Sequence, residues 1–169
     1  VDRMLGPNTI PKKSLISIHQ ILERVRQLVS AEVPAQVKLV RDYDPSIPDL
    51  TADPDQLIQA VLNIVRNAAQ AVGERGEILL RTRTLRQYTL GQLRHKLVIK
   101  VDIVDNGPGI PADMMESIFY PMVTGRAEGT GLGLSIAQTI IHQHGGLIEC
   151  TSEPGNTRFT LLLPLQSTS

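Results

Sequence analysis

Aromatic residues and excess charge are both scarce in the 169-residue sequence. Tryptophan is absent, and there are only two phenylalanines and three tyrosines, whereas proteins that bind single-stranded nucleic acid stack the bases on aromatic side chains. Lysine and arginine together number 17, as do aspartate and glutamate, so the positive excess typical of proteins that bind DNA, RNA or anionic membranes is missing. The composition therefore disfavours nucleic acid and membranes as partners.

Cysteine and long apolar runs are equally rare. The single cysteine, Cys150, has no internal disulfide partner, which suits a reducing compartment, and its apolar strand-like surroundings are typical of a structural thiol. No apolar run approaches the roughly 20 residues of a membrane-spanning helix, and the start of the chain does not resemble a signal peptide. We expect one cytoplasmic domain. Because the sequence opens at Val1 without an initiator methionine, we also expect a fragment of a longer protein.

Hydrophobic periodicity predicts both helices and strands. Apolar residues recur at helical spacing in three segments: 18–31, 53–72 and 132–144. In the second of these, Asp53 is a suitable N-cap, Pro54 suits the first helical position, and Gly73 is expected to end the helix. Six segments are predicted to be strands: 14–17, 37–43, 77–84, 96–104, 147–151 and 157–163.

The order of these segments predicts the fold class. A polar loop around residues 87–95 should join the third and fourth strands into a hairpin, and a turn at 153–156 should join the last two. Strands grouped in hairpins, rather than alternating with helices, favour an α+β sandwich. We expect a mixed, mostly antiparallel sheet of about five strands, covered on one face by three helices.

The stretch from Asp105 to Ser135 contains two clusters of glycine, at 105–110 and 129–133. Glycine lets the backbone approach a ligand closely, and a helix that begins after the second cluster would offer N–H groups to an anion. The glycine spacing of the second cluster does not fit the dinucleotide fingerprint, and a Walker loop would require a lysine that is absent. The pattern therefore predicts a nucleotide site of another kind.

Four polar side chains outside the glycines fit an adenine nucleotide. The Asp105 carboxylate only accepts hydrogen bonds, so in a dry pocket it would select an exocyclic amine such as adenine N6. Asn63 and Asn67 lie one helical turn apart, and amide oxygens suit Mg²⁺ that also takes phosphate oxygens. Arg126 is placed to neutralise phosphates. Alone, Asp105 fits a simple turn and the asparagines a solvated helix face; together they favour ATP and Mg²⁺.

Four segments resemble the conserved boxes of one family, the catalytic ATP-binding domain of two-component sensor histidine kinases, whose fold is shared with the gyrase, Hsp90 and MutL ATPases. These segments are 63–68 (N box), 105–109 (first glycine box), 119–122 (F box) and 129–134 (second glycine box). Two further runs, 42–46 and 120–126, resemble those of the nitrogen-regulation members of the family. The resemblance covers nearly the whole chain.

The resemblance also implies roles for individual residues. Asn67 would be the principal Mg²⁺ ligand and Asn63 the secondary one, while Asp105 would hold adenine. Residues 110–128 would form the ATP lid. The other implied ATP-binding residues are Gly107, Gly109, Arg126, Gly129, Thr130, Gly131, Leu132 and Gly133. Many histidine kinases carry a basic residue and an aromatic residue where this chain has Gln70 and Ala71, so weak ATP binding is expected.

The resemblance further implies an incomplete enzyme. Residues 1–13 would end a preceding dimerisation and phosphoacceptor domain, 14–165 would form the catalytic domain, and 166–169 a disordered tail. We expect the acceptor histidine to lie outside the chain: His19 is interpreted as structural, His95 as a loop residue, and His142 and His144 as pointing to different sides rather than forming a metal pair.

The implied reaction is transfer of the ATP γ-phosphate to that histidine, then to an NtrC-like response regulator. A PII-type signal protein is the other implied partner. The isolated domain would be a monomer and the intact protein a homodimer. Two alternatives are an ATPase switch and a non-catalytic regulatory module. The first is disfavoured because Asn63 stands where the hydrolytic relatives carry a glutamate, and an amide is a poor general base.

Overall fold

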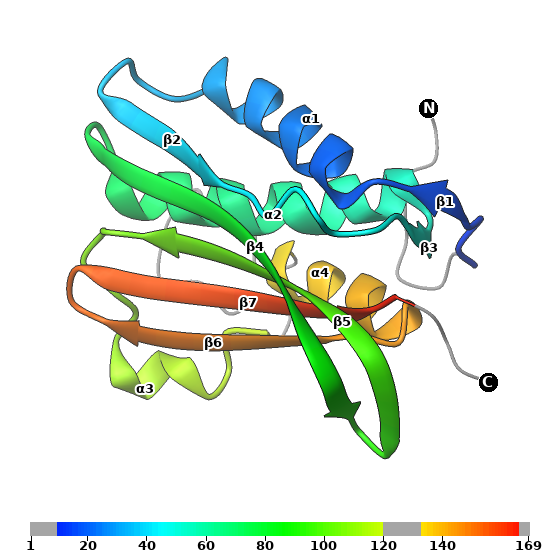
Figure 1. Ribbon diagram of the computed structural model, residues 1–169. Helices are drawn as coiled ribbons and strands as arrows, with labels where there is room; N and C mark the ends of the chain where they lie inside the picture. Colours follow the sequence, from blue (N-terminus) through cyan, green and yellow to red (C-terminus); the bar gives the residue numbers. More distant parts are fainter. Residues whose placement is uncertain (1–9, 120–132, 166–169) are drawn as a thin grey trace.

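The computed structural model describes residues 10–119 and 133–165. A five-stranded sheet in the order β2-β4-β5-β7-β6 forms one layer, and the helices α1, α2 and α4 lie across one of its faces (Figure 1). We call the opposite side of the sheet the outer face. The predicted α+β class, with a mixed sheet and helices on one face, is confirmed.

The helix boundaries follow from local sequence signals. Asp53 caps α2 by accepting hydrogen bonds from the N–H groups of Asp55 and Gln56 at 3.0 and 3.2 Å. Gly73, with φ of +72°, ends the same helix in a conformation that favours glycine. The three long helices match the prediction to within a residue at each end, whereas α3 was not predicted. The helices are α1 (Ile18–Ser30), α2 (Pro54–Val72), α3 (Ala112–Met115) and α4 (Gly133–Gln143).

The strands form one large sheet and one small ribbon. β2 pairs with β4 in parallel, and the β4–β5, β5–β7 and β6–β7 pairs are antiparallel. β1 and β3 form a separate antiparallel ribbon, and β3 was not predicted. The strands are β1 (Ser14–Ile16), β2 (Val37–Asp42), β3 (Leu50–Ala52), β4 (Gly76–Leu90), β5 (Leu93–Asp105), β6 (Leu147–Glu153) and β7 (Asn156–Pro164).

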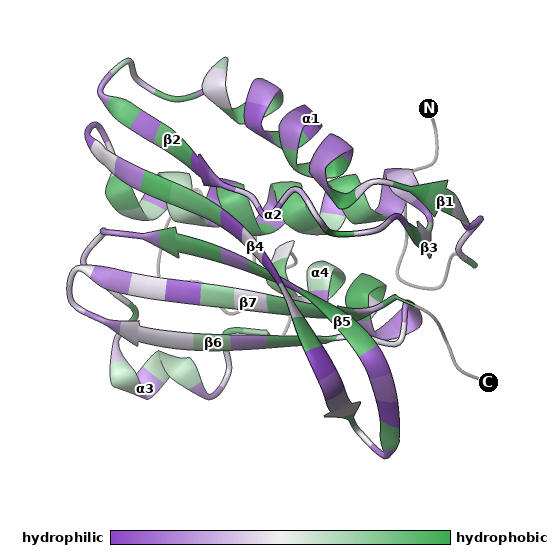
Figure 2. Ribbon diagram, viewed as in Figure 1, coloured by the Kyte–Doolittle hydropathy of each residue, from purple (hydrophilic) through white to green (hydrophobic). Residues whose placement is uncertain are grey.

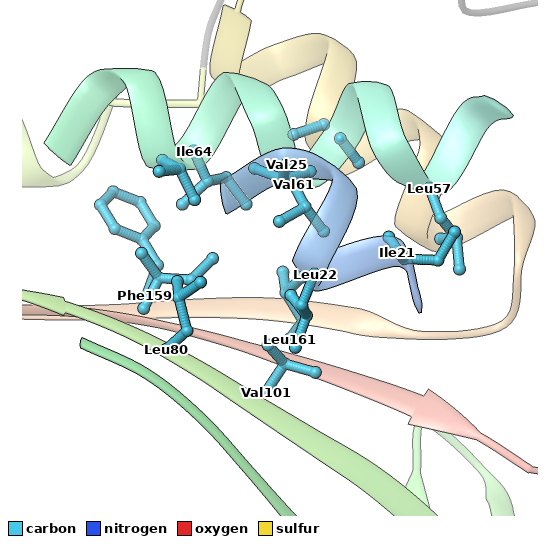
Figure 3. Packing of buried hydrophobic residues seen from close by; sticks show 14 of the residues in the cluster. Ile21, Leu22, Val25, Leu57, Val61, Ile64, Leu80, Val101, Phe159 and Leu161 are labelled. Carbon is cyan, nitrogen blue, oxygen red and sulfur yellow. The ribbon is translucent and has the colours of Figure 1, made fainter. Parts of the chain in front are cut away.

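The main core lies between the sheet and the helices. Figure 3 shows Leu22 of α1 and Ile64 of α2 directed toward Phe159 and Leu161 of the sheet, and all four side chains are almost fully buried. Figure 2 shows hydrophobic and hydrophilic residues alternating along several strands, as expected where alternate side chains point to opposite faces. Burial of this apolar surface holds the helix layer on the sheet.

The polar loop predicted around residues 87–95 is wrong. β4 continues to Leu90 and β5 begins at Leu93, so only Gly91 and Gln92 connect them. Gly91 has φ of +63°, which suits a two-residue hairpin turn. Polar residues dominate this stretch because much of the two-stranded ribbon faces solvent. A polar segment of this kind gives the same sequence pattern whether it is an exposed strand or a loop.

Apolar side chains of the same hairpin form a second, small core with β7. Leu90 and Val98 pack against Leu162 of β7. His95 lies in β5 and is only 5% exposed, so its assignment to a loop is also wrong. The end of the β4–β5 hairpin therefore packs against β7 through these apolar side chains.

Two other histidines are packed between elements. The Nε2 atom of His19 is 2.8 Å from the hydroxyl oxygen of Thr82, and its ring stacks on Tyr43 with centroids 4.7 Å apart. His144 accepts a hydrogen bond from the Asp53 N–H at 3.0 Å and donates one to the Ile140 carbonyl at 2.8 Å. The contacts of His19 fit the structural role expected for it, and those of His144 show that its ring packs inside the fold.

Candidate nucleotide-binding site

Asp105, the last residue of β5, lies at the centre of the candidate site. Its side chain is 3% exposed, and Oδ1 accepts a hydrogen bond from the Gly107 N–H at 2.9 Å. Ile78 of β4 and Thr157 of β7 are its register partners, so the central strand presents the carboxylate between two neighbours. The turn interpretation and the ligand interpretation are thus compatible, because one oxygen closes the turn that orients the group.

The glycines after Asp105 lie against the protein's own backbone. A Cβ at Gly107 would come within 2.8 Å of the Ala71 carbonyl oxygen at the end of α2. A Cβ at Gly109, where φ is +96°, would come within 3.0 Å of the Glu153 carbonyl oxygen. Glycine is required at both positions because α2 and the β6–β7 hairpin approach the loop so closely. We call residues 106–110 the first glycine loop.

The β6–β7 hairpin contacts the first glycine loop directly, which the sequence did not predict. The Gly155 N–H donates to the Gly107 carbonyl at 2.9 Å. The Ile110 N–H donates to the Ser152 hydroxyl at 2.8 Å, and that hydroxyl lies 2.7 Å from the hydroxyl of Thr157. The sequence had indicated only a turn at 153–156, and no local pattern assigns such a turn to a loop 40 residues away.

The two predicted metal ligands lie on the side of α2 that faces α4. Asn63 donates a hydrogen bond from Nδ2 to the carbonyl of Gly133, the first residue of α4, at 3.1 Å. This bond uses the amide nitrogen, and the oxygen is the atom that a metal would bind. Asn67 lies one turn further along α2 and is half-buried. The structure therefore brings α2 to the N-terminus of α4, where an anion would be favoured.

Cys150 lies close enough to Asp105 for the charge of the carboxylate to affect the pKa of the thiol. Burial, and secondarily the negative charge of Asp105, raise the pKa of the Cys150 thiol to about 12. A thiol with so high a pKa stays protonated at neutral pH and is a poor nucleophile. This supports the structural role expected from the sequence and places the thiol beside the candidate site.

Several predicted site residues lie outside the described residues: Arg126, Gly129, Thr130, Gly131 and Leu132. The ATP lid predicted at 110–128 is described only as far as 119, and of the F box only Phe119 is described. Its ring meets Phe159 edge-on, with centroids 6.2 Å apart, so the end of this segment packs on the core.

The donor set fits a nucleotide with a shared Mg²⁺ better than a metal held by protein alone. In residues 10–119 and 133–165, no three His, Cys, Asp or Glu side chains are grouped to hold a metal ion. Mg²⁺ at phosphates commonly takes only one or two protein oxygens together with water, and two neutral amides on α2 fit that pattern. The buried Asp105 carboxylate, oriented by a backbone N–H, suits the amine of adenine.

Comparison with known proteins agrees with this geometry. The model of the family described as "Histidine kinase-, DNA gyrase B-, and HSP90-like ATPase" matches residues 52–167. The chain belongs to this family. As a member of this ATPase family, the chain is an ATP-binding domain, and the matched region includes both asparagines, Asp105 and both glycine clusters.

Comparison with individual proteins shows which members of the ATPase family the chain is similar to. The chain is 58% identical over 167 residues to the sensory histidine kinase/phosphatase NtrB of Klebsiella oxytoca, covering 98% of this chain and 48% of that protein. The chain thus spans about half the length of the curated relatives it matches. The solved catalytic domain of histidine kinase ThkA has a TM-score of 0.78 at 26% identity, covering 91% of this chain and 96% of that domain.

A further solved structure contains histidine kinase ThkA in complex with the response regulator protein TrrA. It matches with a TM-score of 0.73 at 25% identity, covering 92% of this chain and 42% of that kinase. None of the helices in the described parts of this ATPase-family chain combines the length and apolar content that a bilayer crossing needs.

Proposed function

We propose that this chain is the catalytic domain of a nitrogen-regulation sensor histidine kinase. It binds ATP with Mg²⁺ and presents the γ-phosphate to a histidine on a separate phosphoacceptor domain, from which an NtrC-like response regulator receives it. Family membership, the identity to NtrB and the likeness to ThkA support this assignment. Residues 14–165 form the catalytic domain in this proposal, residues 1–13 end the phosphoacceptor domain with its linker, and 166–169 form a tail.

The observation that carries the proposal is the contact between Asn63 and Gly133 at 3.1 Å. It places an amide where α2 meets the start of α4, and the only carboxylate in α2 is Asp55 in the first turn. Hydrolysis needs a general base for water, and an amide is a poor one. Phosphoryl transfer needs mainly positioning and neutralisation of charge, which this site can supply without a base.

Each polar residue then has a defined role. Asp105 accepts the adenine amine, while Asn67 and Asn63 offer amide oxygens to Mg²⁺. When bound, Mg²⁺ neutralises negative charge on the phosphates. Arg126 and residues 129–133 are proposed to contact the phosphates. The packing of His19, His95 and His144 supports an acceptor outside the chain, and the remaining histidine, His142, lies at the far end of α4 from Gly133.

Mixing the chain with its acceptor tests the proposal. We expect label from [γ-³²P]ATP to appear on a separate domain that carries the acceptor histidine, only when both proteins and Mg²⁺ are present. Asn67→Ala should reduce the transfer strongly, whereas Asp55→Asn, an exposed change in the first turn of the same helix, should not. Labelling of the chain by itself, or steady ATP hydrolysis that is lost in Asn63→Ala, would contradict the proposal and favour an ATPase switch.

The proposed partners also include a PII-type signal protein, as a regulatory module would require. The resemblance to nitrogen-regulation kinases implies this partner, together with a homodimeric intact protein and a monomeric isolated domain.

A further inference from the structure

The end of the β6–β7 hairpin holds the first glycine loop at three points. The Gly155 N–H donates to the Gly107 carbonyl at 2.9 Å, and the Glu153 carbonyl lies where a side chain at Gly109 would have to go. The third contact is the bond of 2.8 Å from the Ile110 N–H to the Ser152 hydroxyl. The first two involve only backbone, so Ser152 is the one residue whose side chain holds the loop from this hairpin.

The Ser152 hydroxyl can form hydrogen bonds to two partners at once, and it therefore links the first glycine loop to strand β7. A hydroxyl has one proton and two lone pairs, and one lone pair accepts the Ile110 N–H. Its proton and its second lone pair remain for the Thr157 hydroxyl, 2.7 Å away, and either hydroxyl can be the donor of that bond. Ser152 and Thr157 are register partners, and Thr157 is in turn the register partner of Asp105. One continuous set of neighbours therefore joins the end of the loop to the carboxylate at its start.

We propose that Ser152 is a positioning residue for adenine recognition, which fixes the first glycine loop so that the Asp105 carboxylate meets the base. This inference rests on the proposed function and adds a residue to its site. The loop is fixed at Gly107, whose N–H orients Asp105 and whose carbonyl is held by Gly155. Ser152 fixes the far end of the same loop at Ile110, and both ends are needed to hold a short segment in one conformation.

Removal of the hydroxyl should change binding more than folding. Ser152 is half-buried and lies on β6, the edge strand of the sheet, so Ser152→Ala leaves the main core intact. The Ile110 N–H, however, loses its acceptor, and an unmade hydrogen bond of this kind weakens the bound arrangement. We expect the dissociation constant for ADP to rise about tenfold, while circular dichroism and the midpoint of thermal unfolding stay close to wild type.

The decisive readout is the choice between bases. Inosine diphosphate carries the same phosphates as ADP, but has a carbonyl where adenine has its amine, so it lacks the group that Asp105 is proposed to accept. Ser152→Ala should weaken ADP binding and leave inosine diphosphate binding within about a factor of two, because only the amine contact depends on the positioned carboxylate. A general loosening of the site would weaken both nucleotides equally.

Matched variants complete the experiment, with each dissociation constant measured by competition against a fluorescent ADP analogue. Ser152→Thr keeps a hydroxyl and should restore ADP binding, and Thr151→Ala, an exposed neighbour on the same strand, should behave as wild type. Thr157→Val removes the other hydroxyl of the link and should weaken ADP binding by about threefold, a smaller loss because the Ile110 bond remains.

Two outcomes would overturn the inference alone: wild-type ADP binding in Ser152→Ala, or equal weakening of both nucleotides. The control Asp105→Asn should lose ADP binding in the same assay. If the wild-type chain binds no ADP, the proposed function fails together with the inference.

Discussion

Strand β5 carries two buried aspartates that point to opposite faces of the sheet, and their surroundings differ. Asp102, fully buried on the outer face, accepts a hydrogen bond from the Thr160 hydroxyl at 2.6 Å and lies 3.6 Å from the Lys100 ammonium. Asp105, three positions later and therefore on the helix face, is oriented by the Gly107 backbone.

This difference separates a structural carboxylate from the one that we propose binds adenine. Side chains of the sheet give Asp102 a hydroxyl donor at Oδ1 and a counter-charge 3.6 Å from Oδ2, and Oδ2 itself accepts no hydrogen bond. Asp105 is oriented by a loop at the end of the strand, where the chain leaves the sheet and where we propose that the nucleotide binds. Burial alone therefore does not distinguish the two roles, whereas the source of the partners does.

The largest expected effect is that of an Asp105 substitution on ADP binding. Asp105→Asn replaces an acceptor-only group with one that also carries an N–H donor pair, which opposes the adenine amine. We expect loss of ADP binding by at least about 100-fold, since a mispaired buried polar group costs several kcal/mol. Isothermal titration calorimetry measures it. An unchanged dissociation constant would show that Asp105 does not recognise adenine.

The second largest effect is that of an Asp102 substitution on the stability of the fold. Asp102→Ala leaves the Thr160 hydroxyl and the Lys100 ammonium without their partner and opens a small cavity, so we expect a loss of about 2–3 kcal/mol in the free energy of unfolding. Urea denaturation measures this. ADP binding by the folded variant should stay within about twofold of wild type, and a large binding defect would break the proposed separation of roles.

The smallest effect concerns the end of α2 that is remote from Asp105. Burial lowers the pKa of His144 below its ordinary value of 6.5, so the unfolded chain takes up a proton more readily than the folded one. Stability is therefore full above pH 6.5 and falls as the pH drops from 6.5 through the lower pKa of the folded state. Thermal unfolding between pH 7.5 and 5 should show this loss.

A His144→Gln variant provides the control for that measurement. It should have a shallower pH dependence and unchanged ADP binding at pH 7, with a remaining slope from His19, whose pKa burial also lowers. Identical slopes in the variant and the wild type would show that His144 does not contribute to the acid sensitivity.

The helices and the strongest motif could be predicted from the sequence because their signals are local. Asp53 and Gly73 bound α2 as expected, and the spacing of Asn63 and Asn67 placed both on one side of that helix. The sequence also selected Asp105 rather than Asp102, because glycine follows only Asp105. It failed at residues 87–95, where polar side chains along a twisted hairpin gave the same pattern as a loop.

Residue types and spacings thus determined the fold class, the helix bounds and the nucleotide chemistry of this chain. Only the tertiary structure decided how that chemistry is held. The β5–β7 register places Thr157 beside Asp105, and the β6–β7 register brings Ser152 to Ile110, 42 residues earlier in the chain. Hydrogen bonds between such distant segments depend on which strands become neighbours. That choice results from burial of the whole core rather than from any local pattern.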